Sequence, residues 1–399
     1  MNYLFPVITI PYVVRILGAE KFGLVSFAAA FTAYFSMLID YGFNFSATRS
    51  VSINRENKIK EAQIISYVYL IKFVLLIFSI LVFVPIVLSV DFFYGERELY
   101  LYSFLAVIGT FLTPLWYFQG VEKMLVIAGL TFGIRLILVL SIFIFITNNN
   151  DYKLYTLLNS LSSITIGLIS FFFVIKKFSF PKKENIPNLL NELKESSILF
   201  VSNLSINLYT VSNTFILGLF APPVIVGYWS AADKIRMAVQ NILTPITQGI
   251  YPYLSKLFNS SFSEAIKFIK KTFSIIVFIS IIGSIILFFF AEQLVLLILG
   301  KDYLSSIYIL KIISFLPFII MISNIAGIQI LLNIKGSKEF TIVVFIAAII
   351  NILLSLLLVP KMLAVGTAIS VLITEIFVTL FMSVFAYKRI KKLGGSIEI

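Results

Sequence analysis

The sequence predicts an all-α integral membrane protein with about twelve transmembrane helices in two parallel-repeat bundles of six. Three observations lead to this prediction. First, 60% of the 399 residues are hydrophobic and 13% are charged, whereas soluble proteins average about 45–50% and about 25%. Second, the apolar residues fall into twelve runs, most of them near the roughly 20 residues that a bilayer crossing requires. Third, one motif recurs in both halves.

The twelve apolar runs are separated by short polar connections. Those of the first half cover roughly residues 1–17, 22–47, 62–88, 99–119, 124–147 and 152–175. Those of the second half cover roughly residues 196–220, 224–254, 269–291, 305–332, 339–359 and 363–387. The predicted division is therefore an N-terminal bundle (1–175), a cytoplasmic linker (176–195), a C-terminal bundle (196–388) and a basic cytoplasmic tail (389–399).

The recurring motif lies where each half passes from its first to its second helix. Leu17–Phe31 reads LGAEKFGLVSFAAAF, and Leu217–Ile235 reads LGLFAPPVIVGYWSAADKI. Gly23 aligns with Gly227, and a serine and small residues follow in both. Parallel repeats are a transporter architecture in which the substrate path runs between the halves. The alternative explanation of the match is that small residues recur in membrane helices generally. The first helix is predicted to be short at its N-terminus, as after a late start site or a truncation.

The net charge of +12 is explained by membrane orientation. With the N-terminus in the cytoplasm, the inward connections and the tail hold 20 Lys and Arg residues and the outward connections hold 6. This bias fits the positive-inside rule with both termini cytoplasmic. We therefore expect no nucleic-acid partner.

Cys and His are absent from the sequence. Their absence excludes disulfides, zinc sites and His or Cys catalysis. We expect no cofactor, no metal and no enzyme activity.

A few charged residues fall inside the apolar runs, where function is most expected because each costs about 3 kcal/mol at mid-bilayer. The cations are Lys72, Arg135, Lys234, Arg236 and Lys311, and the anions are Asp40, Asp233 and Glu375. Such groups should face a bundle interior or a watery cavity. The balance of +2 favours an anionic substrate.

Three segments resemble a known family. They are LFPVITIPYVVRILGAEKFGLVSF at Leu4–Phe27, DYGFNFSATRSVS at Asp40–Ser52 and SAADKIRMAVQNILTPITQGIYPYLSKL at Ser230–Leu257. They are similar to Wzx-type O-antigen flippases, in the polysaccharide-transport branch of the multidrug/oligosaccharidyl-lipid/polysaccharide (MOP) exporters. The resemblance extends over essentially the whole chain.

This resemblance implies a fold of two six-helix bundles in a V. It implies that an undecaprenyl-pyrophosphate-linked oligosaccharide is turned from the cytoplasmic to the outer face of a bacterial inner membrane by alternating access. The implied partners are that lipid-linked substrate, membrane lipid, a coupling cation (Na⁺ or H⁺), and the polysaccharide polymerase and chain-length regulator. The short first helix departs from the family pattern and leaves its contribution to the cavity open.

The strongest candidates for contact with the diphosphate are the buried cations, since Arg offers a planar donor fork and Lys a point charge. Asp233, Arg236 and Gln240 are spaced i, i+3, i+7 and share one helix face, with Lys234 to the side. The same spacing also fits a closed ion pair that only packs the helix. Lys72 and Arg135 lie at mid-bilayer depth, facing a cavity or pairing with Glu375 or Asp40. Lys311 and Arg15 are shallower candidates that equally fit snorkelling to an interface.

Other polar residues are candidates for gating, ion coupling or sugar contact. Asp40 and Asn44 are spaced i, i+4 near the cytoplasmic end of the second run, with Arg49 just outside, which fits either an entry gate or a hydrated helix end. Asn203 and Asn207 are sugar-contact candidates, although hydrogen bonding between helices explains them equally. Coupling candidates are Asp40, Asp233 and Glu375. Trp116, Tyr117, Trp229, Tyr251 and Tyr253 are expected at the membrane interfaces.

Three other functions compete with that of an O-antigen flippase. A cation-coupled multidrug exporter would share the fold but favour acidic binding residues. A membrane polysaccharide polymerase needs a long outward loop, and the outward connections here are short. The flippase of the peptidoglycan lipid precursor also shares the fold, but Asp40–Arg49 resembles the polysaccharide branch.

Overall fold

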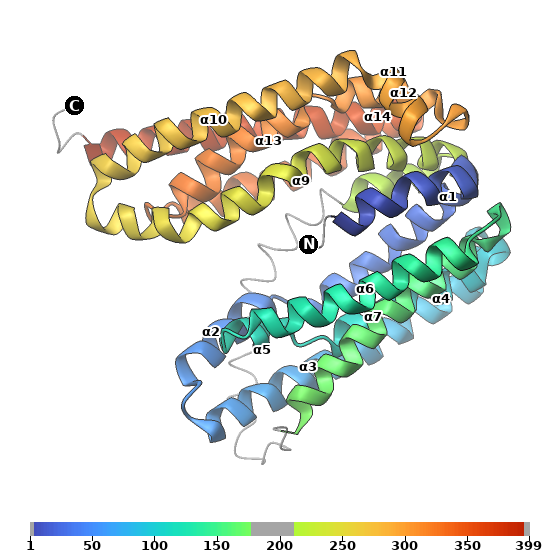
Figure 1. Cartoon of the computed structure of the whole chain (residues 1–399), viewed down its shortest axis with the longest axis horizontal. Helices are drawn as coiled ribbons and strands as arrows, with labels where there is room; N and C mark the ends of the chain where they lie inside the picture. Colours follow the sequence, from blue (N-terminus) through green and yellow to red (C-terminus); the bar gives the residue numbers. More distant parts are fainter. Residues whose placement is uncertain (1–3, 177–210, 395–399) are drawn as a thin grey trace. The chain divides into compact units, whose positions relative to one another are not determined.

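The computed structural model describes residues 4–176 and 211–394, and every regular element in these two ranges is helical (Figure 1). The chain divides into two compact units, residues 1–17 with 24–207 and residues 18–23 with 208–399. The helices of the first half are α1 (Leu4–Asp40), α2 (Phe43–Asn54), α3 (Lys58–Ser89), η1 (Asp91–Glu96), α4 (Arg97–Leu112), α5 (Leu115–Gly120), α6 (Met124–Phe145), η2 (Asn149–Asp151) and α7 (Tyr152–Ile175).

The second half continues the helical pattern. Its first described segment is the apolar helix Val211–Phe220. The helices that follow are α9 (Pro223–Ser260), α10 (Phe262–Phe289), α11 (Ala291–Ile298), η4 (Lys301–Tyr303), α12 (Ser305–Ile313), α13 (Leu316–Asn324), η5 (Ile325–Leu331) and α14 (Ser337–Gly394). The η5 element is a π-helix, so the tenth apolar run predicted from the sequence is not one regular α-helix.

Eight helices in the described residues are long and apolar enough to cross a membrane. Two of them are far longer than one crossing needs, because each joins two of the predicted runs across a kink. The kinks lie at Gly18 (φ 70°, ψ 170°) and Leu363 (φ 50°, ψ −126°). The eighth predicted run is α9, which is less apolar, and the described end of the seventh is Val211–Phe220. The predicted all-α membrane fold is confirmed.

The second predicted run, residues 22–47, is wrong at its C-terminal end. Helix α1 stops at Asp40, and a separate helix, α2, starts at Phe43. Between them Tyr41 and Gly42 both have positive φ, 38° and 77°. A left-handed residue, most often glycine, commonly ends an α-helix. Gly42 was a signal for this break, and the i, i+4 spacing of Asp40 and Asn44 concealed it.

Large apolar side chains on the outside of the helices indicate contact with lipid. On α6, Leu125 is 89% exposed, and Ile137 and Ile144 are also exposed. Contiguous exposed apolar surface of this kind is unstable in water, whereas helices with all backbone groups bonded internally are stable in hydrocarbon. The chain is therefore a multi-pass membrane protein.

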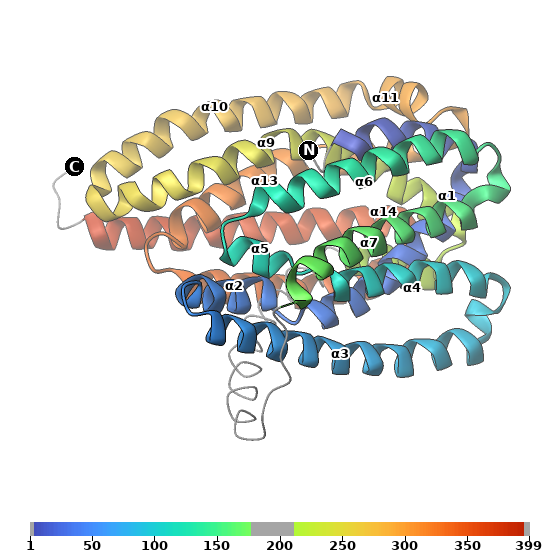
Figure 2. The same cartoon turned by 60° about the horizontal axis from the view of Figure 1, so that its bottom comes forward.

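Small residues allow close helix packing in the first unit. Helices α4 and α7 lie side by side (Figure 2). A Cβ atom placed on Gly109 of α4 would lie 2.7 Å from the carbonyl carbon of Ser163, and one on Gly167 of α7 would lie 2.8 Å from the oxygen of Gly109. Packing through such residues replaces the hydrophobic effect as the source of helix association in a membrane.

The second unit contains a similar contact between the two glycines of the recurring motif. A Cβ atom on Gly23 would lie 2.8 Å from the backbone nitrogen of Gly227, and one on Gly227 would lie 2.7 Å from the carbonyl carbon of Ala19. Both glycines belong to this unit. The two positions that align in the sequence therefore also pack against each other, and neither has room for a side chain.

Candidate functional site

A buried arginine and three polar partners form one cluster in the second unit. We call Asp233, Arg236, Gln240 and Glu375 the Arg236 cluster. The first three lie on α9, where Arg236 is only 7% exposed. Its Nε donates a hydrogen bond of 2.7 Å to Oδ1 of Asp233, and its Nη1 donates to Oε1 of Gln240. The contacts match the shared helix face predicted from the spacing.

Glu375 brings a second carboxylate to this arginine from α14. It is 6% exposed, and its charge interacts with that of Arg236. The sequence left Glu375 as a possible partner of Lys72 or Arg135, and the structure places it beside Arg236 instead. With both carboxylates ionised, the two acids outweigh the guanidinium. Protonating or displacing one carboxyl makes the cluster neutral, and it becomes positive only when both are protonated or displaced.

The guanidinium retains one unused donor group. Nη2 of Arg236 makes no hydrogen bond to any residue in the described ranges 4–176 and 211–394. Neighbouring Lys234 is exposed on the same helix. Because guanidinium donors bind phosphate oxygens through charge-assisted hydrogen bonds, this arrangement is chemically suited to an anion.

A second set of polar residues lies in the first unit, and we call Asp40, Asn44, Lys72 and Thr110 the Lys72 cluster. Lys72 of α3 has no exposed surface, and its Nζ donates a hydrogen bond of 3.0 Å to the carbonyl oxygen of Thr110. Its charge interacts with that of Asp40. Asn44 donates from Nδ2 to Oδ2 of Asp40 at 3.1 Å, across the break between α1 and α2. In this arrangement Lys72 offers no surface to a substrate and instead compensates Asp40.

The remaining candidates are distributed over several helices. Arg135 on α6 is half-buried, while Arg15, Arg49 and Lys311 are exposed. Arg15 and Arg135 each have interactions with other groups of the protein. Asn203, Asn207 and the linker 177–195 lie outside the described residues. Within the described residues, no group of three Asp or Glu is arranged to hold a metal ion.

Sequence reasoning missed a buried carboxylate at the start of α3. Glu61 is buried, and the hydroxyl of Tyr117 donates a hydrogen bond of 2.9 Å to its Oε1. The signal was available, because Glu61 is followed at helical spacing by the buried residues Ile64, Ile65 and Val68.

Trp116, Tyr117 and Trp229 do not present the exposed rings that interfacial anchors need, whereas Tyr253 is 54% exposed. The two tryptophans and Tyr117 are buried within their units. Tyr117 is tied to Glu61, and Trp229 donates from Nε1 to Oγ1 of Thr214 at 3.1 Å. For Tyr117 and Trp229, a partner inside the protein takes the place of water for the polar atom, whereas Nε1 of Trp116 has no hydrogen-bond partner among the described residues.

Comparison with known proteins identifies the family. Residues 1–258 match the model of a family described as "Polysaccharide biosynthesis protein". A protein of Escherichia coli (strain K12) named "Putative O-antigen transporter" is 33% identical over 386 residues, which is 96% of this chain and 93% of the relative. The chain belongs to the polysaccharide biosynthesis family. A relative of the same name in Shigella dysenteriae is 31% identical over 96% of this chain and 95% of its own.

Membership of the polysaccharide biosynthesis family confirms the resemblance to Wzx-type O-antigen flippases seen in the sequence. Solved structures show the fold. The lipid II flippase MurJ, in an inward closed conformation, matches with a TM-score of 0.72 at 17% identity over 97% of this chain and 87% of that one. An inward-facing multidrug resistance MATE transporter of the MOP superfamily matches with a TM-score of 0.70 at 14% identity over 99% and 96%. The chain therefore shares the fold of these two transporters.

Proposed function

We propose that this protein flips an undecaprenyl-pyrophosphate-linked oligosaccharide, an O-antigen or capsule repeat unit, from the cytoplasmic to the outer face of the bacterial inner membrane. The observation that carries the proposal is the 33% identity to an O-antigen transporter homologue over 96% of the chain. The MOP fold supports it, since a lipid II flippase has the same fold. The excess of Lys and Arg in the inward connections supports an orientation with both termini in the cytoplasm.

The Arg236 cluster is the proposed contact for the substrate diphosphate. The substrate's phosphates are costly to move through hydrocarbon, and a buried guanidinium lowers that cost when its donors reach the phosphate oxygens. The unused Nη2 supplies such a donor. Lys234, Arg135, Lys311 and Arg15 remain proposed secondary cations, and Lys72 is proposed to hold Asp40 in place within the first unit.

Glu375 is the proposed coupling carboxylate. When Glu375 binds a proton or a sodium ion, Asp233 alone balances Arg236, and the cluster accepts an anion more readily. When the cation leaves, Glu375 again competes for the guanidinium and the anion is released. Alternating access driven by such an exchange connects transport to a cation gradient. Asp40, Asn44 and Arg49 are proposed as an entry gate.

The first experiment deletes the gene in its host and quantifies lipid-linked repeat units and surface polysaccharide. We expect single lipid-linked repeats to accumulate while the surface glycan disappears, and a plasmid-borne copy to reverse both changes. The chain is not proposed to form bonds itself, so repeat units should still be assembled in the deletion strain.

The same strain separates the competing functions. Unchanged surface glycan together with sensitivity to cationic drugs would establish the multidrug exporter. Surface glycan capped with single repeats would establish the polymerase. Either result would overturn the flippase proposal.

A further inference from the structure

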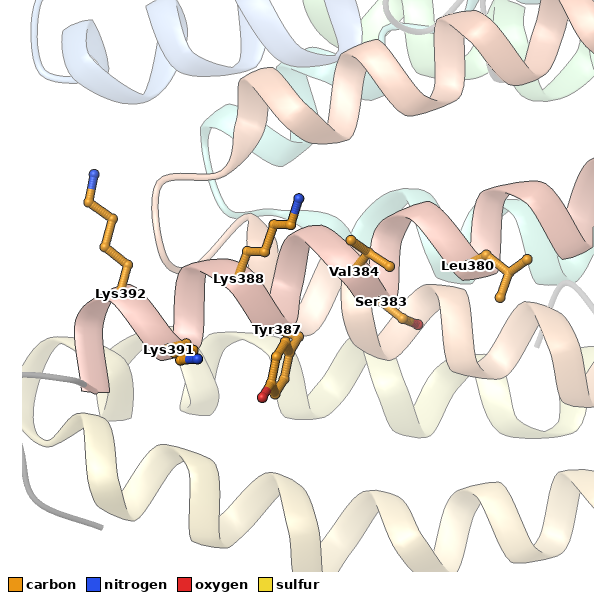
Figure 3. Close-up of a pocket in the computed structure, with 7 residues that line it drawn as sticks. All are labelled: Leu380, Ser383, Val384, Tyr387, Lys388, Lys391 and Lys392. Atoms are coloured by element: carbon orange, nitrogen blue, oxygen red, sulfur yellow. The ribbon is translucent and has the colours of Figure 1, made fainter.

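The last turns of α14 form an open groove of about 680 Å³ (Figure 3), and no member of the Arg236 cluster lines it. Its lining residues are Leu380, Ser383, Val384, Tyr387, Lys388, Lys391 and Lys392. They follow one another at intervals of three and four residues along part of the helix surface. Figure 3 shows the lysines gathered at the C-terminal end of the helix, with Leu380 nearest the opposite end of the groove.

The basic residues at this end of α14 divide into two kinds. Arg389 is fixed, because its Nη2 and Nε donate to Oε1 of Glu339 at 2.7 and 3.0 Å and its Nη1 donates to the carbonyl oxygen of Ile334 at 3.1 Å. Lys388, Lys391 and Lys392 are exposed and form no ion pair or hydrogen bond with the part of the chain that the structure describes. Arg389 therefore holds the helix end in place, and the three lysines do not.

The groove is amphipathic along its length. Leu380 and Val384 are large exposed apolar residues, Tyr387 follows with its ring exposed, and the three ammonium groups come last. Leu380 and Lys391 are separated by about 16 Å along the helix axis. An apolar strip that ends in an aromatic ring and several cations matches a molecule with a hydrocarbon chain and an anionic head. At a membrane surface, that molecule is a lipid.

We infer that this groove binds an anionic phospholipid of the cytoplasmic leaflet. The lysines contact the phosphate of the headgroup, and one acyl chain lies along Val384 and Leu380. Lysine suits this role because it supplies a flexible point charge and its methylene stem can lie along apolar surface. The inference goes beyond the proposed function. It depends on the proposed orientation of the chain, which puts this end of α14 at the cytoplasmic surface, but not on the identity of the transported glycan.

The test measures lipid binding to the purified full-length protein by native mass spectrometry, with phosphatidylglycerol and phosphatidylcholine as probes. The variant K388Q/K391Q/K392Q removes the three unpaired charges. The matched control K267Q/K270Q/K271Q removes three exposed lysines near the start of α10 in the same unit. Both variants must keep the wild-type melting temperature, since all six lysines are exposed and none forms an ion pair with the described residues.

We expect wild type and control to bind phosphatidylglycerol about tenfold more tightly than phosphatidylcholine, and the groove variant to lose this preference. A further variant, L380N/V384N, should weaken phosphatidylglycerol binding in the same assay while leaving the charge intact. Unchanged binding in the groove variant overturns the inference, as does equal loss in both lysine variants, which would indicate diffuse surface charge. Displacement of phosphatidylglycerol by undecaprenyl diphosphate at equimolar amounts would assign the groove to the transport substrate and overturn the choice of phospholipid.

Discussion

Arg236 and Asp233 lie one helical turn apart on α9 and share a hydrogen bond of 2.7 Å between Nε and Oδ1. This bond fixes one edge of a guanidinium that is almost wholly buried, while Gln240 fixes a second donor. A side chain held in this way is pre-organised, so binding of an anion at the remaining donor costs little further ordering. The pairing therefore fits a positioned ligand contact as well as it fits helix packing, and mutation separates the two.

Replacing Arg236 with Ala should reduce transport strongly while leaving membrane insertion intact. A hydrogen bond to a charged group contributes about 1.5–3 kcal/mol, so we expect surface polysaccharide synthesis to fall by about ten- to a hundredfold. Arg236→Lys should keep part of the activity because the charge remains. Complementation of the deletion strain, normalised to protein level, measures this effect. The control is Lys256→Ala, which removes an exposed cation from the same helix.

Normal surface polysaccharide in both Arg236→Ala and Arg135→Ala, at equal protein level, would rule out the cationic cavity. Loss of protein from the membrane in Arg236→Ala but not in Arg236→Lys would instead assign the pair to folding.

Removing the charge of Glu375 should uncouple transport from the cation gradient. In Glu375→Gln the guanidinium keeps only Asp233 as its acidic partner, so cation binding no longer changes the charge of the cluster. We expect an imposed proton or sodium gradient to change the flipping rate in vesicles containing wild type but not in those containing the variant. The exposed acid Glu292, at the first turn of α11, provides the control Glu292→Gln. A gradient response equal to wild type in Glu375→Gln would move the coupling site elsewhere.

Hydropathy predicted the helices well because a membrane imposes a simple rule, that each crossing is apolar and satisfies its own backbone. It did not predict where helices stop. Asp40 and Asn44 keep the i, i+4 spacing of a continuous helix and are hydrogen bonded, yet the helix breaks between them. The side-chain bond survives because the left-handed pair Tyr41 and Gly42 turns the chain without separating the two side chains.

The interaction partners of the buried charges depend on tertiary structure, so the sequence could only limit the set of possible partners. Local spacing predicted that Asp233, Arg236 and Gln240 share a face, and their contacts bear this out. Glu375 is far from Arg236 in the sequence, so no periodicity could join them. Depth alone predicted that Lys72 is buried, but whether it faces a cavity depends on the surrounding helices, and these enclose it completely.

The interaction between Lys72 and Asp40 should appear as a coupling energy in a double-mutant cycle. Lys72→Met preserves the side-chain volume but leaves Asp40 without its cation, and Asp40→Asn does the converse. We expect each single variant to lose about 1–3 kcal/mol of stability and the double variant to lose clearly less than the sum. Melting of the purified protein in detergent measures the three values. Lys60→Met, at an exposed position of the same helix, should change little, and strict additivity would show that the two charges act independently.

The contact between the two repeated glycines should make Gly227 intolerant of any side chain. In Gly227→Ala the new methyl group would meet the backbone of Ala19, which cannot move aside as a flexible side chain could. Overpacking of this kind costs about 1–3 kcal/mol, so we expect a lower melting temperature and less protein in the membrane.

Gly249→Ala is the matched control, since Gly249 lies on the same helix with nothing within 4 Å of the added atom. There the loss of backbone entropy in the unfolded chain should stabilise the helix by about 0.5–1 kcal/mol. Opposite shifts of melting temperature in the two variants separate helix propensity from the glycine contact, because propensity alone would stabilise both. Equal stabilisation would mean that Gly227 is not held against Ala19.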